Sequence, residues 1–230
     1  MKWTFRAVGL ALFLLGAATI ASADTVQLTL NNGGNDVLGG VYVGPYNFTG
    51  VTGGATVPLQ LICDDYGDDV YPGETWTSTT SSYTPLNIGS LQFPGSSSAQ
   101  YLEAAWLAQR IFANLGNPQL VGWMQYALWD IFTSGASSGL GASDQGQVNY
   151  WLGQAAANYN CPTCNYSNVV IYTPVPGTQK PNADGLPQEY LGLVPPGSGG
   201  NTNNVPEPAT LLLMGAGFSG LASYRRRFSS

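Results

Sequence analysis

The chain has 230 residues, of which only 9% are charged, and its net charge is −6. It contains no histidine, which excludes Ser-His-Asp and Cys-His catalytic sets as well as histidine-containing zinc sites. Between residues 24 and 194 the basic side chains are Arg110 and Lys180 alone, so the basic surface that a nucleic-acid partner requires is missing. The abundance of Gly, Ser, Thr and Asn is typical of an extracellular, β-rich protein, and we expect neither an enzyme nor a bound cofactor.

The beginning of the chain has the order of a secretory signal peptide. Lys2 and Arg6 precede an apolar run at 7–20, and a small-residue triplet, Ala-Ser-Ala, ends at Ala23. Signal peptidase reads such a triplet, so we expect this partner to cleave before Asp24 and remove the first 23 residues. An uncleaved anchor is the alternative, but the apolar run is short for a membrane span.

The next part of the chain predicts strands. Apolar residues alternate with polar ones over 26–30, which is the period of a half-buried strand, and a Gly- and Asn-rich turn follows at 31–36. Further β-like runs, rich in β-branched and aromatic residues, stand at 41–43, 46–48, 57–63, 76–83, 169–172 and 190–193.

The middle of the chain changes to a helical period. Ser97 or Ser98 is a candidate N-cap, and Gln100 completes a capping box with Ser97. Helices are predicted from there to Leu115, at about 119–133 and at about 144–157. The expected fold is α+β. A mainly β, barrel- or sandwich-like domain at 24–194 carries an inserted helical subdomain of about three helices at about 98–158.

Gln125 and the cysteines depart from the usual pattern. Gln125 falls on the apolar stripe of the second predicted helix, and a buried carboxamide without partners costs about 1–3 kcal/mol, so it must find some. A hydrogen bond to the backbone of a neighbouring strand is the ordinary solution. Cys161 and Cys164 either close on each other, which leaves Cys63 unpaired, or one of them pairs with Cys63. A buried, inert Cys63 thiol is a further alternative.

Two segments resemble the thioester domains of bacterial surface adhesins. Leu-Ile-Cys-Asp-Asp at 61–65 matches their apolar-Cys-acid motif, and Met-Gln-Tyr-Ala-Leu-Trp at 124–129 matches their Thr-Gln-x-Ala-apolar-Trp helix. The resemblance spans roughly 59–132. It departs from the family at Met124, where the family usually has Thr.

The resemblance implies that Cys63 condenses with the Gln125 side chain, releases ammonia and leaves an internal thioester. An amine or hydroxyl on an unknown target surface, or on a polysaccharide, then attacks the carbonyl and becomes acylated. This is acyl transfer performed once, which is adhesion rather than enzymatic turnover. The departure at Met124 leaves open a protein that holds the two residues together without the bond. The aromatic residues expected to shield the bond from water are Trp106, Trp123, Tyr126 and Trp129.

The loop after Cys63 is acidic. Its carboxylates, which offer the oxygen ligands that calcium prefers, are Asp64, Asp65, Asp68 and Asp69. They lack the spacing and the terminal Glu of an EF-hand loop, so a solvated acidic turn is the default interpretation and no metal site is expected.

The end of the chain has three parts. Residues 195–204 are rich in Pro, Gly, Ser and Asn and predict a flexible linker. At 205–230, Pro206-Glu207-Pro208 precedes an apolar stretch at 209–224, for which we predict a single transmembrane helix. An arginine cluster follows, made of Arg225, Arg226 and Arg227.

This tail resembles the PEP-CTERM sorting signal of Gram-negative bacteria, which is sometimes labelled an ice-binding protein C-terminal motif. The resemblance implies an exosortase as partner, an inner-membrane anchor with a cytoplasmic C-terminus, and later release to the cell surface or extracellular matrix. A covalent or lapsed thioester adhesin is the first hypothesis for the function. The alternatives are a non-covalent biofilm or matrix protein and, last, an exported enzyme.

Overall fold

The computed structural model describes residues 25–34, 36–83, 85–181 and 187–194. Six antiparallel strands form a closed barrel, in which each strand pairs with two neighbours. In order around the barrel they are β1 (Thr25–Asn32), β4 (Tyr46–Thr52), β5 (Ala55–Cys63), β8 (Tyr190–Leu193), β7 (Val169–Pro174) and β6 (Thr75–Ser82).

Alternation along the strands determines which side chains fill the barrel. Val26, Leu28 and Leu30 of β1 are buried, while the residues between them are exposed or half-buried, as the period of two predicts. Neighbouring strands add a cluster of aromatic rings that meet edge to face at the centre. Phe48 lies between Trp76 and Tyr190, with ring centroids 5.7 and 4.8 Å away.

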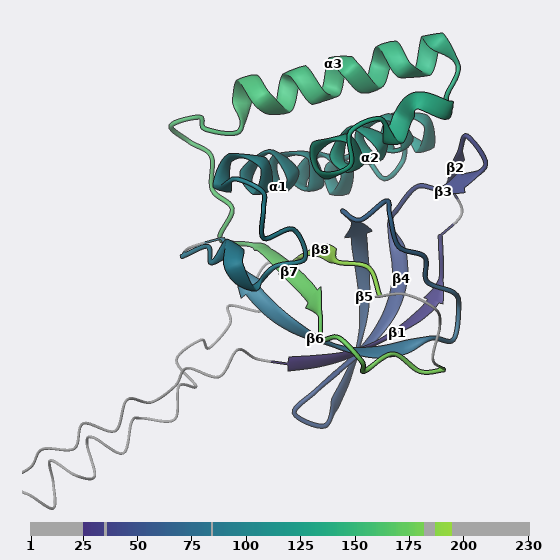
Figure 1. Ribbon diagram of the computed structural model, residues 1–230, viewed down its shortest axis with the longest axis vertical. Helices are drawn as coiled ribbons and strands as arrows, with labels where there is room; N and C mark the ends of the chain where they lie inside the picture. The colour runs from purple at the N-terminus through teal and green to yellow at the C-terminus, as the bar shows by residue number, and fades with distance from the viewer. Residues whose placement is uncertain (1–24, 35, 84, 182–186, 195–230) are drawn as a thin grey trace, which may run out of the picture. The chain divides into compact units, whose positions relative to one another are not determined.

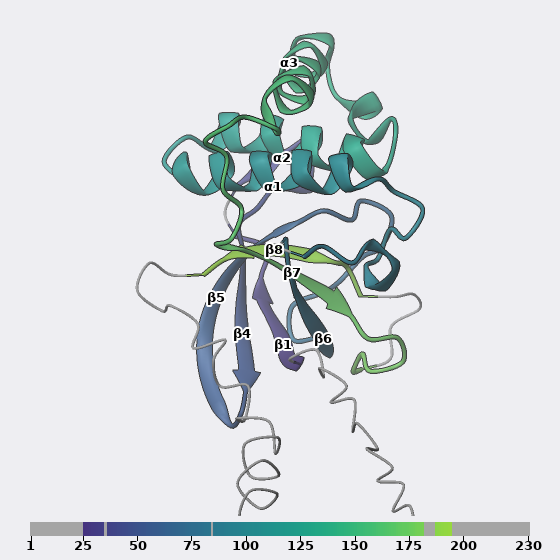
Figure 2. The same cartoon turned by 90° about the vertical axis from the view of Figure 1, so that its left-hand side faces the viewer.

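Three α-helices are inserted between β6 and β7: α1 (Ser98–Ala113), α2 (Pro118–Phe132) and α3 (Ala142–Asn158). The predicted capping box at the start of α1 is confirmed, because Ser97 accepts from the Gln100 N–H and Gln100 accepts from the Ser97 N–H. Figures 1 and 2 show α1 and α2 side by side across one end of the barrel, with α3 on their far side. α1 contacts β8, and α2 contacts β5.

A small hairpin rests against α2. It consists of β2 (Val37–Leu38) and β3 (Val41–Tyr42), and two short 3-10 helices, η1 (Ile88–Ser90) and η2 (Ala136–Gly139), flank the larger helices. The hairpin packs closely because Gly122 of α2 has no side chain. A β-carbon there would lie 3.0 Å from the Leu38 side chain.

The expected fold class needs correction. Hydrogen bonding closes the sheet into a barrel, so the sandwich alternative is wrong. The transmembrane helix included in that fold class is not seen either, since no helix in the described part of the chain is long and apolar enough to cross a membrane. The stretch for which it was predicted, 209–224, lies outside the described residues.

Candidate functional site

Cys63 is the last residue of β5, at the end of the barrel that the helices cover. Its side chain is fully buried, and its thiol donates to the backbone carbonyl oxygen of Asp65, 3.0 Å away. Burial raises the pKa of the Cys63 thiol well above its ordinary value, and the carboxylates of Asp65 and Asp64 raise it further. At neutral pH the sulfur is therefore a protonated thiol, without a disulfide partner.

Gln125 comes from the middle of α2 and points at the end of β5. Its side-chain Nε2 donates to the carbonyl oxygen of Cys63 at 2.5 Å, which joins residues 62 positions apart in the chain. The Gln125 side chain is completely buried, and its Oε1 has no hydrogen-bond partner among the described residues. A carboxamide has two donor hydrogens and two acceptor lone pairs, so the site satisfies it only in part.

Trp129 lies one helical turn after Gln125 and also faces Cys63. Hydrogen bonding from its side chain lowers the pKa of the Cys63 thiol, opposing the effect of burial. In the neutral state the Trp129 indole N–H is buried without a partner at hydrogen-bonding geometry. The indole is a donor only, and a charged thiolate at Cys63 is a stronger acceptor than the thiol, so this N–H is available to stabilise a thiolate. Tyr126 and Tyr66 pack against Trp129, with ring centroids 5.0 and 5.1 Å away.

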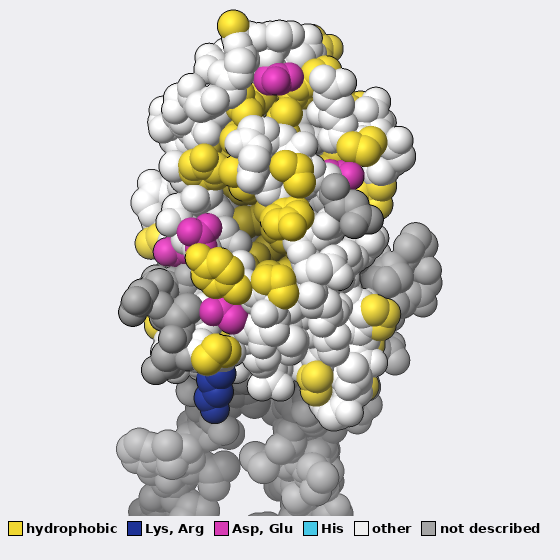
Figure 3. Space-filling model, turned by 90° about the vertical axis from the view of Figure 1, so that its right-hand side faces the viewer, with side chains coloured by type: hydrophobic (Ala, Val, Ile, Leu, Met, Phe, Trp, Pro, Cys, Tyr) yellow, Lys and Arg dark blue, Asp and Glu magenta, His cyan; other side chains and the backbone are white. Residues whose placement is uncertain are grey.

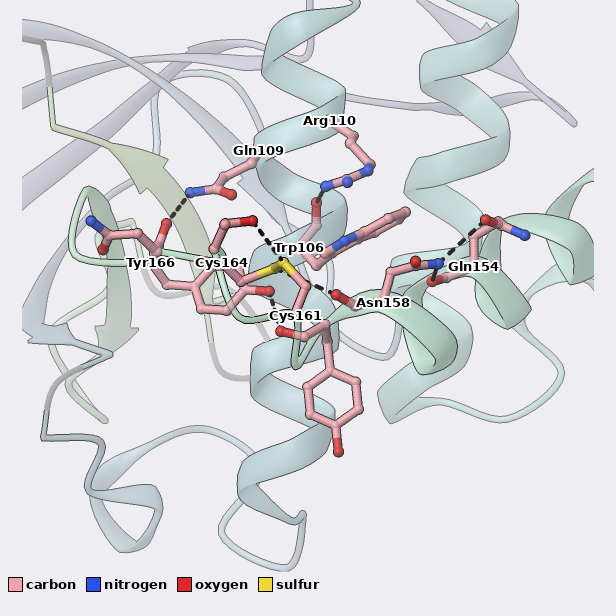
Figure 4. Close-up of a disulfide and its surroundings, with 11 residues drawn as sticks. Trp106, Gln109, Arg110, Gln154, Asn158, Cys161, Cys164 and Tyr166 are labelled. Carbon is pink, nitrogen blue, oxygen red and sulfur yellow. Dashed lines mark hydrogen bonds between the residues drawn. A yellow bond between two sulfur atoms is a disulfide. The ribbon is translucent and has the colours of Figure 1, made fainter.

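The other two tryptophans expected around the thioester contact α3 instead. Trp123 donates its indole N–H to the Asp144 carboxylate, 2.9 Å away. Trp106 packs against Trp151, and the Arg110 guanidinium lies 3.2 Å from its ring centroid (Figure 4). On a helix, residues two positions apart do not share a face, which is why Gln125 and Trp123 diverge.

Cys161 and Cys164 form a disulfide with an S–S distance of 2.07 Å. It closes a short loop after α3, and Figure 4 shows it beside Trp106 and Tyr166. The sequence left several cysteine pairings open, and the structure contains the pairing of Cys161 with Cys164. Cys63 is a free, buried cysteine.

The acidic loop is the solvated turn expected from the sequence only in its second half, because Asp69 is exposed and Asp68 half-buried, whereas Asp64 and Asp65 are buried. Asp64 lies beside Glu189, and burial raises the pKa of both carboxyls, for Asp64 with a further contribution from the charge of Glu189. Glu189 accepts hydrogen bonds from the Tyr101 hydroxyl at 3.0 Å, the Gln92 backbone N–H at 3.0 Å and the Thr173 hydroxyl. These donors stabilise charge on Glu189, so the proton of the pair resides on Asp64.

Asp65 is held by the loop itself. Its Oδ1 accepts from the backbone N–H groups of Gly67 and Asp68, at 2.9 and 3.3 Å, and its Oδ2 accepts from Gln92 at 3.3 Å. Burial raises the pKa of Asp65 to about 6. Among the described residues no three carboxylate or cysteine side chains are arranged to hold a metal ion.

A pocket of about 320 Å³ opens beside Trp129 and the loop that follows Cys63. We call it the Trp129 pocket, and its lining includes Tyr42, Tyr46, Asp65, Tyr66, Asp69 and Trp129. Figure 3 shows the face that carries β2 and β3, where hydrophobic side chains gather in a band with acidic side chains beside it. The pocket shares Asp65 and Trp129 with the surroundings of the Cys63 sulfur.

The sequence reasoning missed Glu189, Gln188 and Tyr46. Gln188 donates to the carbonyl oxygens of Asp65, at 2.9 Å, and Asp68, which fixes the loop after Cys63. Two polar residues directly before the apolar strand β8 are the signal that could have revealed Gln188 and Glu189. No comparable signal marks Tyr46, whose place in the pocket depends on the barrel.

The remaining predicted sites lie outside the described residues. They are the cleavage point between Ala23 and Asp24 and the tail residues 206–208 and 225–227.

Comparison with known proteins identifies the tail. Residues 204–227 match the family model of the PEP-CTERM protein-sorting motif. This motif implies an exported protein that is anchored to the membrane before processing and has an exosortase as its processing partner. No curated protein and no solved structure shows significant similarity to the chain. The match covers the tail alone and does not extend to the barrel domain.

Proposed function

We propose that this exosortase-processed protein is a surface or matrix adhesion module whose barrel domain forms an internal thioester between Cys63 and Gln125. The observation that carries the proposal is the hydrogen bond from Gln125 Nε2 to the Cys63 carbonyl oxygen, which holds the carboxamide at the residue bearing the thiol. Both side chains are completely buried. Water, the competing nucleophile, is therefore kept from the bond.

The unmet hydrogen-bonding capacity of Gln125 supports the same reaction. As an amide, Gln125 leaves its buried Oε1 without a donor, which carries a cost of about 1–3 kcal/mol. Thioester formation removes the polar –NH2 group and replaces the amide carbonyl by a weaker acceptor. The desolvation penalty of the buried group consequently falls when the bond forms.

The condensation balances without an external reagent. The Cys63 sulfur bonds to Gln125 Cδ, the C–N bond breaks, and the thiol proton completes the ammonia that leaves. Since the raised pKa keeps Cys63 protonated, the proton needed by the leaving nitrogen is present at the site. The later attack by a target amine or hydroxyl occurs once per molecule, so we propose an acylating adhesin rather than an enzyme.

Intact-mass measurement of the purified exported protein tests the proposal. The expected mass is lower than that of the processed chain by one ammonia molecule. Methylamine treatment should remove this deficit by adding one methylamine and exposing one thiol. Cys63→Ala should abolish the deficit, and so should Gln125→Glu, which preserves the size of the side chain but has no ammonia to release.

Cys161→Ser combined with Cys164→Ser is the matched control for the thiol. The disulfide packs near Trp106 and Tyr166, so its removal should leave the ammonia deficit intact. A wild-type protein with the full mass and a titratable Cys63 would contradict the thioester. It would leave the non-covalent matrix protein as the better account of the exported chain.

A further inference from the structure

The Trp129 pocket has the composition of a site for an organic cation. Tyr42 and Tyr66 are 54% and 37% exposed, so their rings are accessible, and Asp69 is exposed in the same lining. No described residue donates a hydrogen bond to the Asp69 carboxylate. Aromatic faces together with a free carboxylate attract ammonium groups, through the ring quadrupole and the negative charge.

Charge elsewhere in the domain reinforces this preference. In the described residues the cations are Arg110, which stacks on Trp106 of the helical layer, and Lys180, which lies between β7 and β8 in the chain and forms an isolated β-bridge with Thr75. Neither belongs to the pocket lining, whereas Asp65 and Asp69 do. An approaching ammonium group thus meets a site of negative potential with no competing cation in its wall.

The pocket also shares wall residues with the surroundings of the Cys63 sulfur. Trp129 forms part of its wall and places a buried, unpartnered indole N–H where it can donate to a Cys63 thiolate. Tyr46 is a second wall residue, and burial raises its pKa well above the ordinary value, with a further contribution from the charge of Cys63. With about 320 Å³, the pocket lies at the lower end of the size range of small-molecule sites, roughly 300–1,000 Å³.

We propose that the Trp129 pocket is the entry site for the nucleophile that opens the thioester, and that it selects a primary alkylammonium group held by Asp69 between Tyr42 and Tyr66. This inference rests on the thioester function proposed above and specifies its substrate class. A lysine side chain and a free polyamine share this chemistry, whereas an alcohol or a neutral sugar hydroxyl does not.

In the transfer step the Gln125 acyl group moves from the Cys63 sulfur to the amine nitrogen. The ammonium gives one proton to Asp69 or to water, and its nitrogen lone pair attacks the Gln125 acyl carbon. The C–S bond breaks with its electron pair on Cys63, while the Trp129 N–H stabilises the departing thiolate. The sulfur then takes a second proton from the nitrogen. The products are an amide, a free Cys63 thiol and one released proton.

The proposed preference of the pocket for alkylammonium groups is tested by reacting the exported protein with nucleophiles of different charge. Putrescine and N-acetyl-lysine amide are cationic at neutral pH, whereas hydroxylamine is uncharged and opens thioesters by the same attack. The rate of each reaction is followed by intact mass. In Asp69→Asn the ratio of the putrescine rate to the hydroxylamine rate should fall roughly tenfold, and in the wild type it should fall with rising salt.

Asp144→Asn is the matched control, since it removes one carboxylate from α3 outside the pocket and should leave the ratio unchanged. The ratio for N-acetyl-lysine amide should fall as well. A larger fall for N-acetyl-lysine amide than for putrescine would support a protein target, and the reverse a free polyamine. An equal ratio in wild type and Asp69→Asn overturns the pocket inference while the ammonia deficit and the hydroxylamine reaction still stand. Absence of the deficit itself refutes the thioester instead.

Discussion

Gly44 is the position where a single added methyl group tests the geometry of the site. A β-carbon there would lie 3.0 Å from Gln125 Oε1 and 3.1 Å from Ile62 Cδ1, whereas ordinary van der Waals contact begins at 3.4 Å. Gln125 and Ile62 are both completely buried, so neither side chain has solvent to move into. The carboxamide is planar and its nitrogen is bound to Cys63, so displacing the oxygen by about 0.4 Å also moves the reacting carbon.

The expected cost of Gly44→Ala follows from these distances. Overpacking of this kind destabilises a protein by about 1–3 kcal/mol. In a domain of this size each kcal/mol lowers Tm by roughly 2–4 °C. Since misplacing reacting groups by about 1 Å can cost 10²-fold in rate, a shift of about 0.4 Å should slow thioester formation roughly fivefold.

Two measurements on the same sample check this expectation. Thermal unfolding gives the loss of stability, and intact mass gives the fraction that lacks ammonia at fixed times after synthesis. Gly146→Ala is the control, because a β-carbon at this exposed α3 position meets nothing within 4 Å; it should form the thioester at the wild-type rate and should not lower Tm. If Gly44→Ala kept both the wild-type Tm and the full ammonia deficit, the tight packing of the carboxamide against Gly44 would be refuted.

Three further predictions concern stability and leaving-group chemistry. The pKa of Asp64 in the folded protein is raised above its unfolded value near 3.9, so unfolding at a pH between the two values releases a proton. The stability that protonated Asp64 contributes is therefore fully present below pH ~4 and is lost as the pH rises through the folded pKa. Asp64→Asn should therefore reduce the fall in Tm between pH 5 and pH 8, and an unchanged fall would contradict the placement of the proton on Asp64. Trp129→Phe should slow the methylamine reaction roughly ten- to a hundredfold, since a hydrogen bond to a charged group contributes about 1.5–3 kcal/mol, and an unchanged rate would exclude the indole N–H from stabilising the thiolate. Gly146→Ala should itself raise stability by about 0.5–1 kcal/mol in denaturant unfolding, because Ala is the better helix former at an exposed position; a loss of stability would show an unrecognised contact at α3.

Local features of the chain were predictable from the sequence because they depend on neighbouring residues. The α1 capping box connects Ser97 with Gln100, and the alternation of β1 needs only a period of two, so both predictions are confirmed. The sorting motif at 204–227 is likewise a short linear pattern with its parts in a fixed order. Such signals do not require the folded domain for their recognition.

Contacts between distant parts of the chain depend on the barrel. Closure of the sheet through β5 and β8 brings Glu189 to Asp64 and Gln188 to the loop after Cys63, which buries carboxylates that look solvated in the sequence. The side of α2 that faces the barrel likewise determines that Trp129, and not Trp123, stands beside the cysteine.

The sequence alone thus determined that the chain carries a sorting tail and an odd cysteine, and that Gln125 lies on an apolar helix face. Only the tertiary structure decided that Gln125 and Cys63, 62 positions apart, are in contact, and that an acidic, aromatic pocket opens beside Trp129 and the loop after Cys63. The physical reason is that the contacts of α2 depend on how the helix packs across the end of the closed barrel. Periodicity predicts which residues are buried, but not which of them meet.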